Sequence, residues 1–133
     1  MKAVSARLTK GLNIGSLVNA SDNSGARIVR IVGVKRGRTR VGRQQFVKIG
    51  DFVKVSVRAG LPTMKGQVFD AVVIRQKKPY RRYTGERVAF TDNAVALLKD
   101  DKGNPKGTQI KGPIAREVSD RWQFLGKIAK YTL

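Results

Sequence analysis

The chain has 133 residues, of which 41% are hydrophobic, and it contains neither cysteine nor histidine. This length allows one domain with a buried core, and the two missing residue types exclude disulfides, the usual zinc and iron-sulfur sites, and catalysis through imidazole or thiolate. The 28 Lys and Arg residues against 9 Asp and Glu residues give a formal net charge of +19, so we expect a polyanionic partner, most commonly a nucleic acid.

The first residues are basic but lack the apolar core of a signal peptide, and no stretch approaches the roughly 18 apolar residues of a membrane span. We therefore expect a cytoplasmic protein without a membrane partner, a cofactor, a metal or a small-molecule substrate. One domain is predicted over residues 1–133: an N-terminal extension at 1–15, a β-barrel with a hairpin at 16–98, and a loop with short C-terminal helices at 99–133.

Three strands are predicted between residues 27 and 74. Residues 27–34 are rich in Ile and Val. In 51–58 the residues Val53, Val55 and Val57 alternate with polar residues, which predicts a strand with one buried face. Residues 67–74 contain the continuous apolar run 71–74, which predicts a strand with both faces at least partly covered.

A hairpin and a further strand follow. Residues 80–83 and 87–90 flank a Thr-Gly-Glu turn, where Gly85 can adopt the positive φ of a tight turn, and 94–98 is again apolar. Turn-forming residues at 22–25, 59–62 and 100–107 separate the strands. This even spacing predicts a closed barrel.

Near the C-terminus the apolar period changes from two to three or four, which is the spacing of one helical face. The residues concerned are Ile114, Val118, Trp122, Leu125 and Ala129. Pro113 suits the first turn of a helix, and Ser119 or Asp120 suits the cap of a second one. We expect one broken helix or two short helices, and therefore a mostly β fold with a helical C-terminus.

The basic residues form two clusters. No acidic residue lies between Asp22 and Asp51, an interval that contains Arg27, Arg30, Lys35, Arg36, Arg38, Arg40, Arg43 and Lys48. The second cluster consists of Arg75, Lys77, Lys78, Arg81 and Arg82, interleaved with Tyr80 and Tyr83. Guanidinium groups bind phosphate bidentately and tyrosine rings stack on exposed bases. The alternative is that the charges cover solvated strand faces and that the tyrosines pack within the protein, which is the favoured interpretation for the tyrosines.

No motif for nucleotide binding or catalysis is present. The sequence lacks both the GxxxxGK[ST] phosphate loop and the GxGxxG fingerprint. The acidic residues are scattered singly apart from Asp100 and Asp101, so we interpret them as turn formers, caps and ion-pair partners, and we expect no enzyme. A hydrolase that assembles distant carboxylates remains a rival hypothesis.

Several segments resemble the signature of the universal large-subunit ribosomal protein L-fourteen family. They are 71–79, 81–82, 84–85 and 90–94, supported by 22–27, 50–51, 107–108 and 112–117. The resemblance covers residues 16–133. Thr84, Ala96 and Gln109 depart from the usual residues, and Gln109 replaces an arginine, which weakens a charged contact there. Residues 1–15 and 67–70 resemble the archaeal and eukaryotic branch.

The resemblance implies a small closed five-stranded β-barrel with a projecting β-hairpin and short C-terminal α-helices. It implies a structural constituent of the large ribosomal subunit that binds large-subunit rRNA and lies at the intersubunit interface. The other implied partners are small-subunit rRNA at intersubunit bridges, neighbouring ribosomal proteins and a subunit anti-association factor. A free-standing β-barrel RNA chaperone or translation factor is the alternative.

Carried onto this sequence, the resemblance and the basic clusters give two sets of candidate residues. The rRNA-binding set is Asn23, Ser24, Gly25, Arg27, Lys35, Arg36, Arg38, Arg40, Arg43, Arg75, Lys77, Lys78, Arg81 and Arg82. The set facing the other subunit or factors is Pro62, Thr63, Lys65, Lys106, Gly107, Thr108, Gln109, Arg116 and Arg121. Replacing Arg81 and Arg82 by alanine is expected to weaken RNA binding and to leave the melting temperature nearly unchanged.

Overall fold

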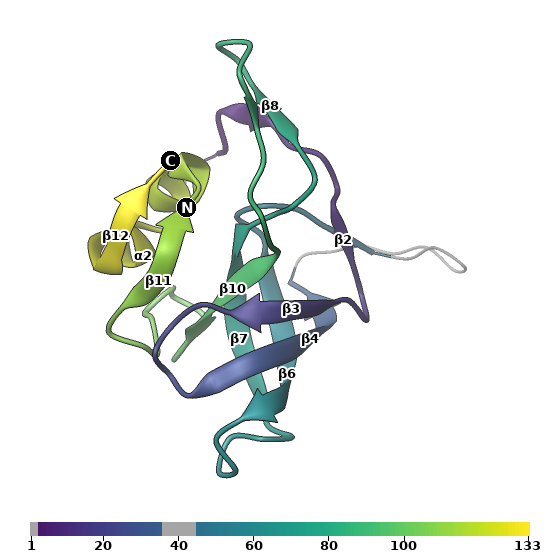
Figure 1. Ribbon diagram of the computed structural model, residues 1–133, viewed down its shortest axis with the longest axis vertical. Coiled ribbons are helices and arrows are strands. Elements are labelled where there is room, and N and C mark those ends of the chain that lie inside the picture. Colours follow the sequence, from purple (N-terminus) through teal and green to yellow (C-terminus); the bar gives the residue numbers. More distant parts are fainter. Residues whose placement is uncertain (1–2, 36–44) are drawn as a thin grey trace.

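The computed structural model describes residues 3–35 and 45–133, and its centre is a closed barrel of five strands (Figure 1). The strands are β3 (Leu17–Ala20), β4 (Ala26–Val34), β6 (Phe52–Gly60), β7 (Val68–Arg75) and β10 (Ala94–Leu98). Neighbours pair antiparallel, except that β10 closes the barrel on β3 in parallel. The predicted barrel is therefore confirmed, and only its short strand β3 was not predicted.

The barrel interior is filled by the apolar faces of its strands. Val53, Val55 and Val57 of β6 are at most 1% exposed, whereas Lys54 and Arg58 between and after them are exposed. This alternation confirms the predicted half-buried strand. Residues 71–74 of β7 are completely buried, which confirms the prediction that both faces of this strand are covered.

A second sheet of three short strands projects from the barrel. It consists of β1 (Ala6–Arg7), β8 (Tyr80–Arg82) and β9 (Arg87–Val88), with β8 in the middle. The hairpin β8–β9 turns at Gly85, which has a φ of +93° as predicted, and forms the top of the molecule in Figure 1. A further pair joins β2 (Leu12–Asn13) to β5 (Phe46–Val47).

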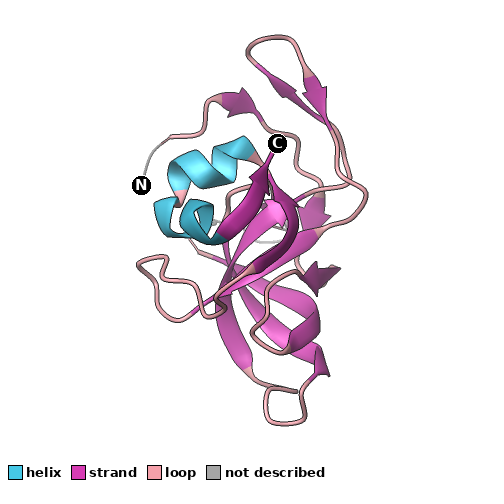
Figure 2. Cartoon of the chain, turned by 60° about the vertical axis from the view of Figure 1, so that its left-hand side comes forward, coloured by secondary structure: helices cyan, strands magenta, loops and turns pink. Residues whose placement is uncertain are grey.

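The C-terminal segment forms one unit against the barrel, with its two helices on one side (Figure 2). Its elements are β11 (Ile110–Ile114), α1 (Arg116–Arg121), α2 (Gln123–Ile128) and β12 (Ala129–Thr132), and β11 pairs with β12 in parallel. The expected pair of short helices is confirmed. No helix in the described residues is long and apolar enough to cross a membrane.

Two details of the predicted helices are wrong. Pro113 lies in β11 opposite Tyr131 and does not begin a helix, because α1 starts only after the extended residue Ala115. Ser119 lies inside α1 and does not cap α2, since the helix breaks three residues later. The break falls at Trp122, whose indole donates a hydrogen bond to the Gly50 carbonyl (2.9 Å) and whose side chain is buried.

Candidate nucleic-acid interface

Most acidic side chains accept hydrogen bonds or form ion pairs within the chain. The surface therefore keeps an excess of positive charge. Asp22, for example, is buried and accepts hydrogen bonds from the Leu97 amide (2.9 Å) and the Ser24 hydroxyl (2.7 Å). Across residues 3–35 and 45–133, the basic side chains that form ion pairs are Lys35, Lys54, Arg75 and Arg82. The other lysines and arginines of this part form no ion pair with its carboxylates.

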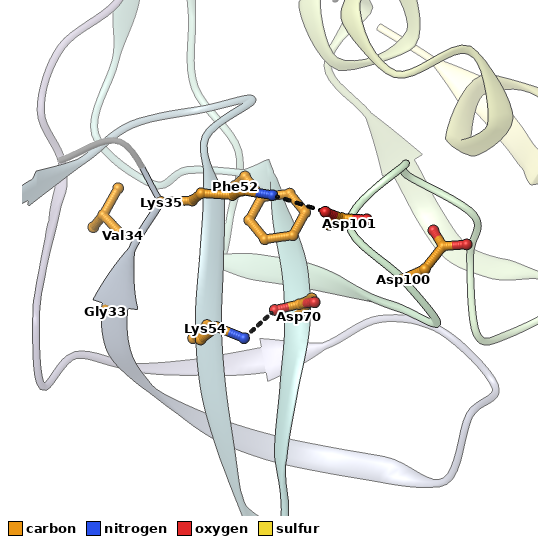
Figure 3. Close-up of a pocket in the computed structure, with 8 residues that line it drawn as sticks. All are labelled: Gly33, Val34, Lys35, Phe52, Lys54, Asp70, Asp100 and Asp101. Carbon is orange, nitrogen blue, oxygen red and sulfur yellow. Dashed lines mark hydrogen bonds and ion pairs between the residues drawn. The ribbon is translucent and has the colours of Figure 1, made fainter.

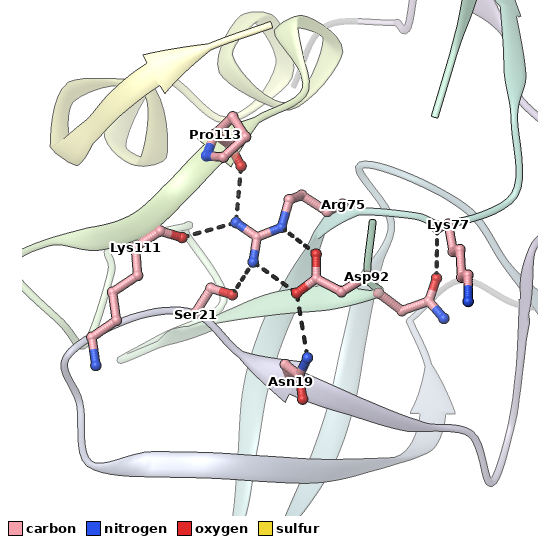
Figure 4. A network of polar contacts seen from close by, with 8 residues as sticks. Asn19, Ser21, Arg75, Lys77, Asp92, Lys111 and Pro113 are labelled. Atoms are coloured by element: carbon pink, nitrogen blue, oxygen red, sulfur yellow. Dashed lines mark hydrogen bonds and ion pairs between the residues drawn. The ribbon is translucent and has the colours of Figure 1, made fainter. Parts of the chain in front are cut away.

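Arg75 is buried in a polar network between the barrel and β11 (Figure 4). Its Nε donates to Asp92 Oδ1 (2.9 Å), and its Nη2 donates to Asp92 Oδ2 (3.1 Å) and to Ser21 Oγ (2.5 Å). Its Nη1 donates to the carbonyls of Lys111 (2.8 Å) and Pro113 (3.0 Å). A guanidinium has five N–H donors, and all five point into the protein, so Arg75 has no donor left for a phosphate.

The carboxylate in this network is held in its charged form. Burial raises the pKa of Asp92, but the hydrogen bonds from Arg75 and Asn19 outweigh it, and the pKa lies below its ordinary value. The neighbouring residue Asn93 accepts a hydrogen bond from the Lys77 amide (2.8 Å). The turn around Asp92 therefore fixes the backbone where the second basic cluster begins.

Arg82 is also buried, in a network that joins the hairpin to α1. Its Nε donates to Glu117 Oε1 (2.8 Å), and the Tyr80 hydroxyl donates to Glu117 Oε2 (2.7 Å). Its Nη2 donates to the Leu133 carbonyl. Burial raises the pKa of Glu117, but the hydrogen bonds from Arg82 and Tyr80 outweigh burial, so this pKa lies below its ordinary value. The pKa of Tyr80 is raised by burial and by its hydrogen bond to the Glu117 carboxylate.

The remaining residues of the second cluster are directed outward. Lys77, Lys78 and Arg81 are exposed, as is Tyr83, whose exposed fraction is 76%. Tyr80 is 1% exposed, so the packing interpretation holds for Tyr80 and not for Tyr83. Alternation along β8 thus separates side chains that stabilise the protein from side chains that face solvent.

The turn at 22–25 is joined directly to the loop at 106–109. Asn23 Oδ1 accepts hydrogen bonds from the amides of Thr108 (2.7 Å) and Gln109 (3.2 Å), and Asn23 Nδ2 donates to Thr108 Oγ1 (2.7 Å). Gly107 is buried and lies so close to Asn23 that a side chain would not fit, since a Cβ at this position would lie 2.7 Å from Asn23 Oδ1. The structure therefore brings together residues predicted to face rRNA and residues predicted to face the other subunit.

A third segment lies against the same turn. The Leu61 amide donates to the Gly25 carbonyl (3.0 Å), and Gly25 has a φ of +106°. Pro62, Thr63 and Lys65 in the adjoining loop are exposed, as is Arg27. We call residues 22–25, 61–66 and 106–109 the turn cluster. Its loop 61–66 lies at the end of the molecule opposite the hairpin (Figure 1).

Lys35 lines an open pocket of about 520 Å³ on the side of the barrel (Figure 3). Its ammonium lies 4.6 Å from the centre of the Phe52 ring and 3.5 Å from Asp101. The second lysine of the pocket, Lys54, pairs with Asp70 at 2.8 Å. Because carboxylates already compensate both lysines, this pocket is a poorer phosphate site than the hairpin.

The Asp100 carboxylate of this pocket is held by hydrogen bonds from its own loop. Asp100 accepts hydrogen bonds from Asn104 Nδ2 (2.7 Å) and the Lys102 amide (3.0 Å). The hydrogen bond from Asn104 keeps the pKa of Asp100 below its ordinary value, so Asp100 is not a proton donor at neutral pH. Groups of three or more potential metal-ligating side chains are absent from the described residues.

The last candidates lie near α1 and the turn cluster. Arg116 is exposed, whereas the Arg121 side chain is half-buried with its Nε enclosed. Lys106 lies with its ammonium 5.0 Å from the centre of the Phe69 ring. Four further candidates lie outside the described residues: Arg36, Arg38, Arg40 and Arg43.

Sequence reasoning missed two arginines of the three-stranded sheet. Arg87 faces Arg81 across the hairpin, and Arg7 faces Arg81 from β1. The position of Arg87 follows from the predicted hairpin once its register is known. Nothing in the sequence of the two-residue strand β1 predicts that it pairs with β8. The position of Arg7 beside Arg81 could therefore not be predicted.

Similar proteins match this chain over nearly its full length. Residues 11–133 match the family described as ribosomal protein L14p/L23e. A protein of Nanoarchaeum equitans named large ribosomal subunit protein uL14 is 53% identical over 130 residues, which cover 98% of both chains. Proteins with the same name from Methanothrix thermoacetophila and Halobacterium salinarum are 49% and 46% identical over 129 residues, covering 97% of this chain and 95% and 97% of theirs. The chain belongs to the ribosomal protein L14p/L23e family.

Proposed function

We propose that this chain is a structural constituent of the large ribosomal subunit in the cytoplasm, where it binds large-subunit rRNA and catalyses no reaction. The observation that carries the proposal is the match to a ribosomal protein family over residues 11–133, with relatives named large ribosomal subunit proteins. The net charge of +19 supports RNA as the partner, because phosphates neutralise such a surface.

In this proposal the exposed basic side chains bind phosphates and release counterions, while the barrel holds them in fixed positions. Lys77, Lys78 and Arg81 are the donors that we assign on the hairpin side, and Arg27 is the donor that we assign beside the turn cluster. Arg75 and Arg82 act as positioning residues, since their own donors are occupied within the protein.

We assign the contacts with the other subunit to the loops of the turn cluster and to the exposed side of α1. The loops offer exposed Pro62, Thr63 and Lys65, and the adjoining segment offers Thr108 and Gln109. The partners proposed for these surfaces are small-subunit rRNA at intersubunit bridges, neighbouring ribosomal proteins and an anti-association factor that binds near Arg116.

Sedimentation of a native cell extract tests the ribosomal assignment. The tagged full-length chain is expected to migrate with large subunits and to remain there after a wash at moderate salt. A free-standing RNA chaperone or translation factor would be released by the wash, and that result would overturn the proposal.

Subunit joining tests the interface assignment separately. Large subunits that carry the Lys65→Ala, Lys106→Ala double variant are expected to join small subunits more weakly, measured by light scattering, with unchanged incorporation of the protein. Lys54→Ala, on the side of the barrel, is the matched control. Equal joining by the double variant and the control would remove these loops from the interface.

A further inference from the structure

The three-stranded sheet places three arginines in one row. In β1, β8 and β9 the register pairs Arg7 with Arg81 and Arg81 with Arg87. Directly opposed residues of antiparallel strands project from the same face of a sheet. The same register puts Tyr80 opposite Val88, and both are buried, so the arginine face is the outer face.

The three side chains are exposed and have no partner within the described part of the chain. No carboxylate there lies within ion-pair distance of Arg7, Arg81 or Arg87. Glu86, the acidic residue of the hairpin, lies 4.0 Å from Arg82 Nη1 instead. Like charges directly opposite each other destabilise a sheet, so this row costs stability unless an anion binds between the side chains.

The surroundings of the row fit a nucleotide chain. Arg7, Arg81, Arg82 and Tyr83 line an open hollow of about 200 Å³. Tyr83 is the most exposed of the large apolar side chains identified in the described residues, at 76%, and an exposed aromatic ring is a stacking surface for a base. Arg82 is fixed below the sheet by Glu117, which holds the middle strand in place.

The spacing of the row matches several phosphates. Neighbouring strands lie about 4.8 Å apart, so the outer two strands are separated by roughly 10 Å. A stacked nucleic-acid strand carries one phosphate per about 3.4 Å of its axis. A row of this length therefore reaches more than one phosphate of the same strand.

We propose that Arg7, Arg81 and Arg87 together bind consecutive phosphates of one RNA strand, with the Tyr83 ring stacking on an adjacent base. The inference rests on the proposed function and adds two residues and the strand β1 to its RNA-binding site. In this arrangement the N-terminal segment completes the site, because β1 supplies the arginine at one end of the row.

The test compares three double variants of the full-length chain. The Arg7→Ala, Arg87→Ala variant removes both ends of the row, and the Arg58→Ala, Lys99→Ala variant removes two exposed charges from the barrel. Binding to an archaeal large-subunit rRNA transcript is measured at several salt concentrations, and the melting temperature is measured without RNA. Arg7→Lys, Arg87→Lys retains the charge but loses bidentate geometry.

The row variant is expected to bind about tenfold more weakly for each arginine removed and to lower the salt slope by about 1 per arginine. Its melting temperature without RNA is expected to stay constant or rise, because like charges have been removed. The lysine variant is expected to retain most of the salt slope while binding more weakly than the wild type.

Equal binding by the row variant and the barrel control would overturn the arginine row and leave the proposed function intact. A lower melting temperature of the row variant without RNA would show that the arginines have a structural role, and would also overturn the proposal. If the wild-type chain does not bind the rRNA transcript, the proposed function fails together with the row.

Discussion

At the scale of single residues, neighbouring arginines have opposite roles. Arg81 faces solvent, whereas Arg82 is buried against Glu117, a residue 35 positions away in the sequence. Arg75 depends in the same way on Asp92, 17 positions away. The sequence predicted a basic cluster but not which members are buried, because burial is set by partners that only the folded chain brings close.

The burial of Arg82 changes one expectation about mutants. Replacing Arg81 and Arg82 together was expected to leave the melting temperature nearly unchanged, but removal of Arg82 leaves the buried Glu117 carboxylate without its cation. We therefore expect the double variant to be destabilised, so that Arg81→Ala alone is the variant that tests RNA binding.

Arg75→Ala is predicted to destabilise the protein by about 3 kcal/mol, because it leaves a partly buried carboxylate and two carbonyls without their donor. The free energy of unfolding in urea measures this. Lys54→Ala removes an ion pair whose lysine is 60% exposed and is predicted to cost less than about 1 kcal/mol. Similar losses in the two variants would contradict the structural role of Arg75.

Glu117→Gln is predicted to change the acid dependence of stability. The pKa of Glu117 is lowered in the folded protein, so its contribution is present above the ordinary value of 4.5 and is lost as the pH falls through the folded pKa. The variant is therefore less stable than the wild type at neutral pH, and the difference shrinks as the solution is acidified below 4.5. Urea unfolding at several pH values measures this, and a difference independent of pH would contradict it.

At the scale of elements, the strands with a periodic pattern were predictable and the short ones were not. The alternation in β6 and the apolar run in β7 carry enough residues to define a period. In contrast, β1, β2 and β5 have two residues each, and their pairing is set by the surrounding structure. The parallel pair of β11 and β12 was missed because the apolar spacing around it suggested a longer helix.

The turn cluster depends on Gly60, which lies close to the backbone of Gly25. Gly60 has a φ of +148°, and a Cβ there would lie 2.5 Å from the Gly25 carbonyl oxygen. Gly60→Ala is predicted to cost more than about 2 kcal/mol and to weaken subunit joining, because the loop 61–66 must move away from the turn 22–25. Thermal unfolding and light scattering measure the two effects.

Gly66→Ala is the matched control in the same loop. Its φ is +84°, but apart from its own residue and its two chain neighbours no atom lies within 4 Å of the added Cβ. Only the backbone conformation is therefore penalised, by about 1 kcal/mol. If both variants lose the same stability, the close approach of Gly60 to Gly25 does not hold the turn cluster together.

At the scale of the whole molecule, the acidic side chains are used mainly for internal contacts and the basic ones mainly for the surface. Asp22, Asp92 and Glu117 each join segments distant in the sequence. The net charge and the family resemblance could be read from the sequence, and so could the exposed candidates Lys77 and Lys78. The arrangement that joins the turn 22–25 to the loop 106–109 could not, since it depends on the amide of Thr108 lying next to Asn23.

A density map of large subunits purified from cells that make this chain tests the central claim most directly. The claim is that a rigid barrel and the three-stranded sheet that projects from it present unpaired arginines and lysines to rRNA phosphates. The map is expected to show the chain on the large subunit, with the guanidinium groups of Arg7, Arg81 and Arg87 within hydrogen-bonding distance of the RNA backbone. Large subunits that lack the chain, or a chain whose arginine row faces solvent or protein, would contradict this account.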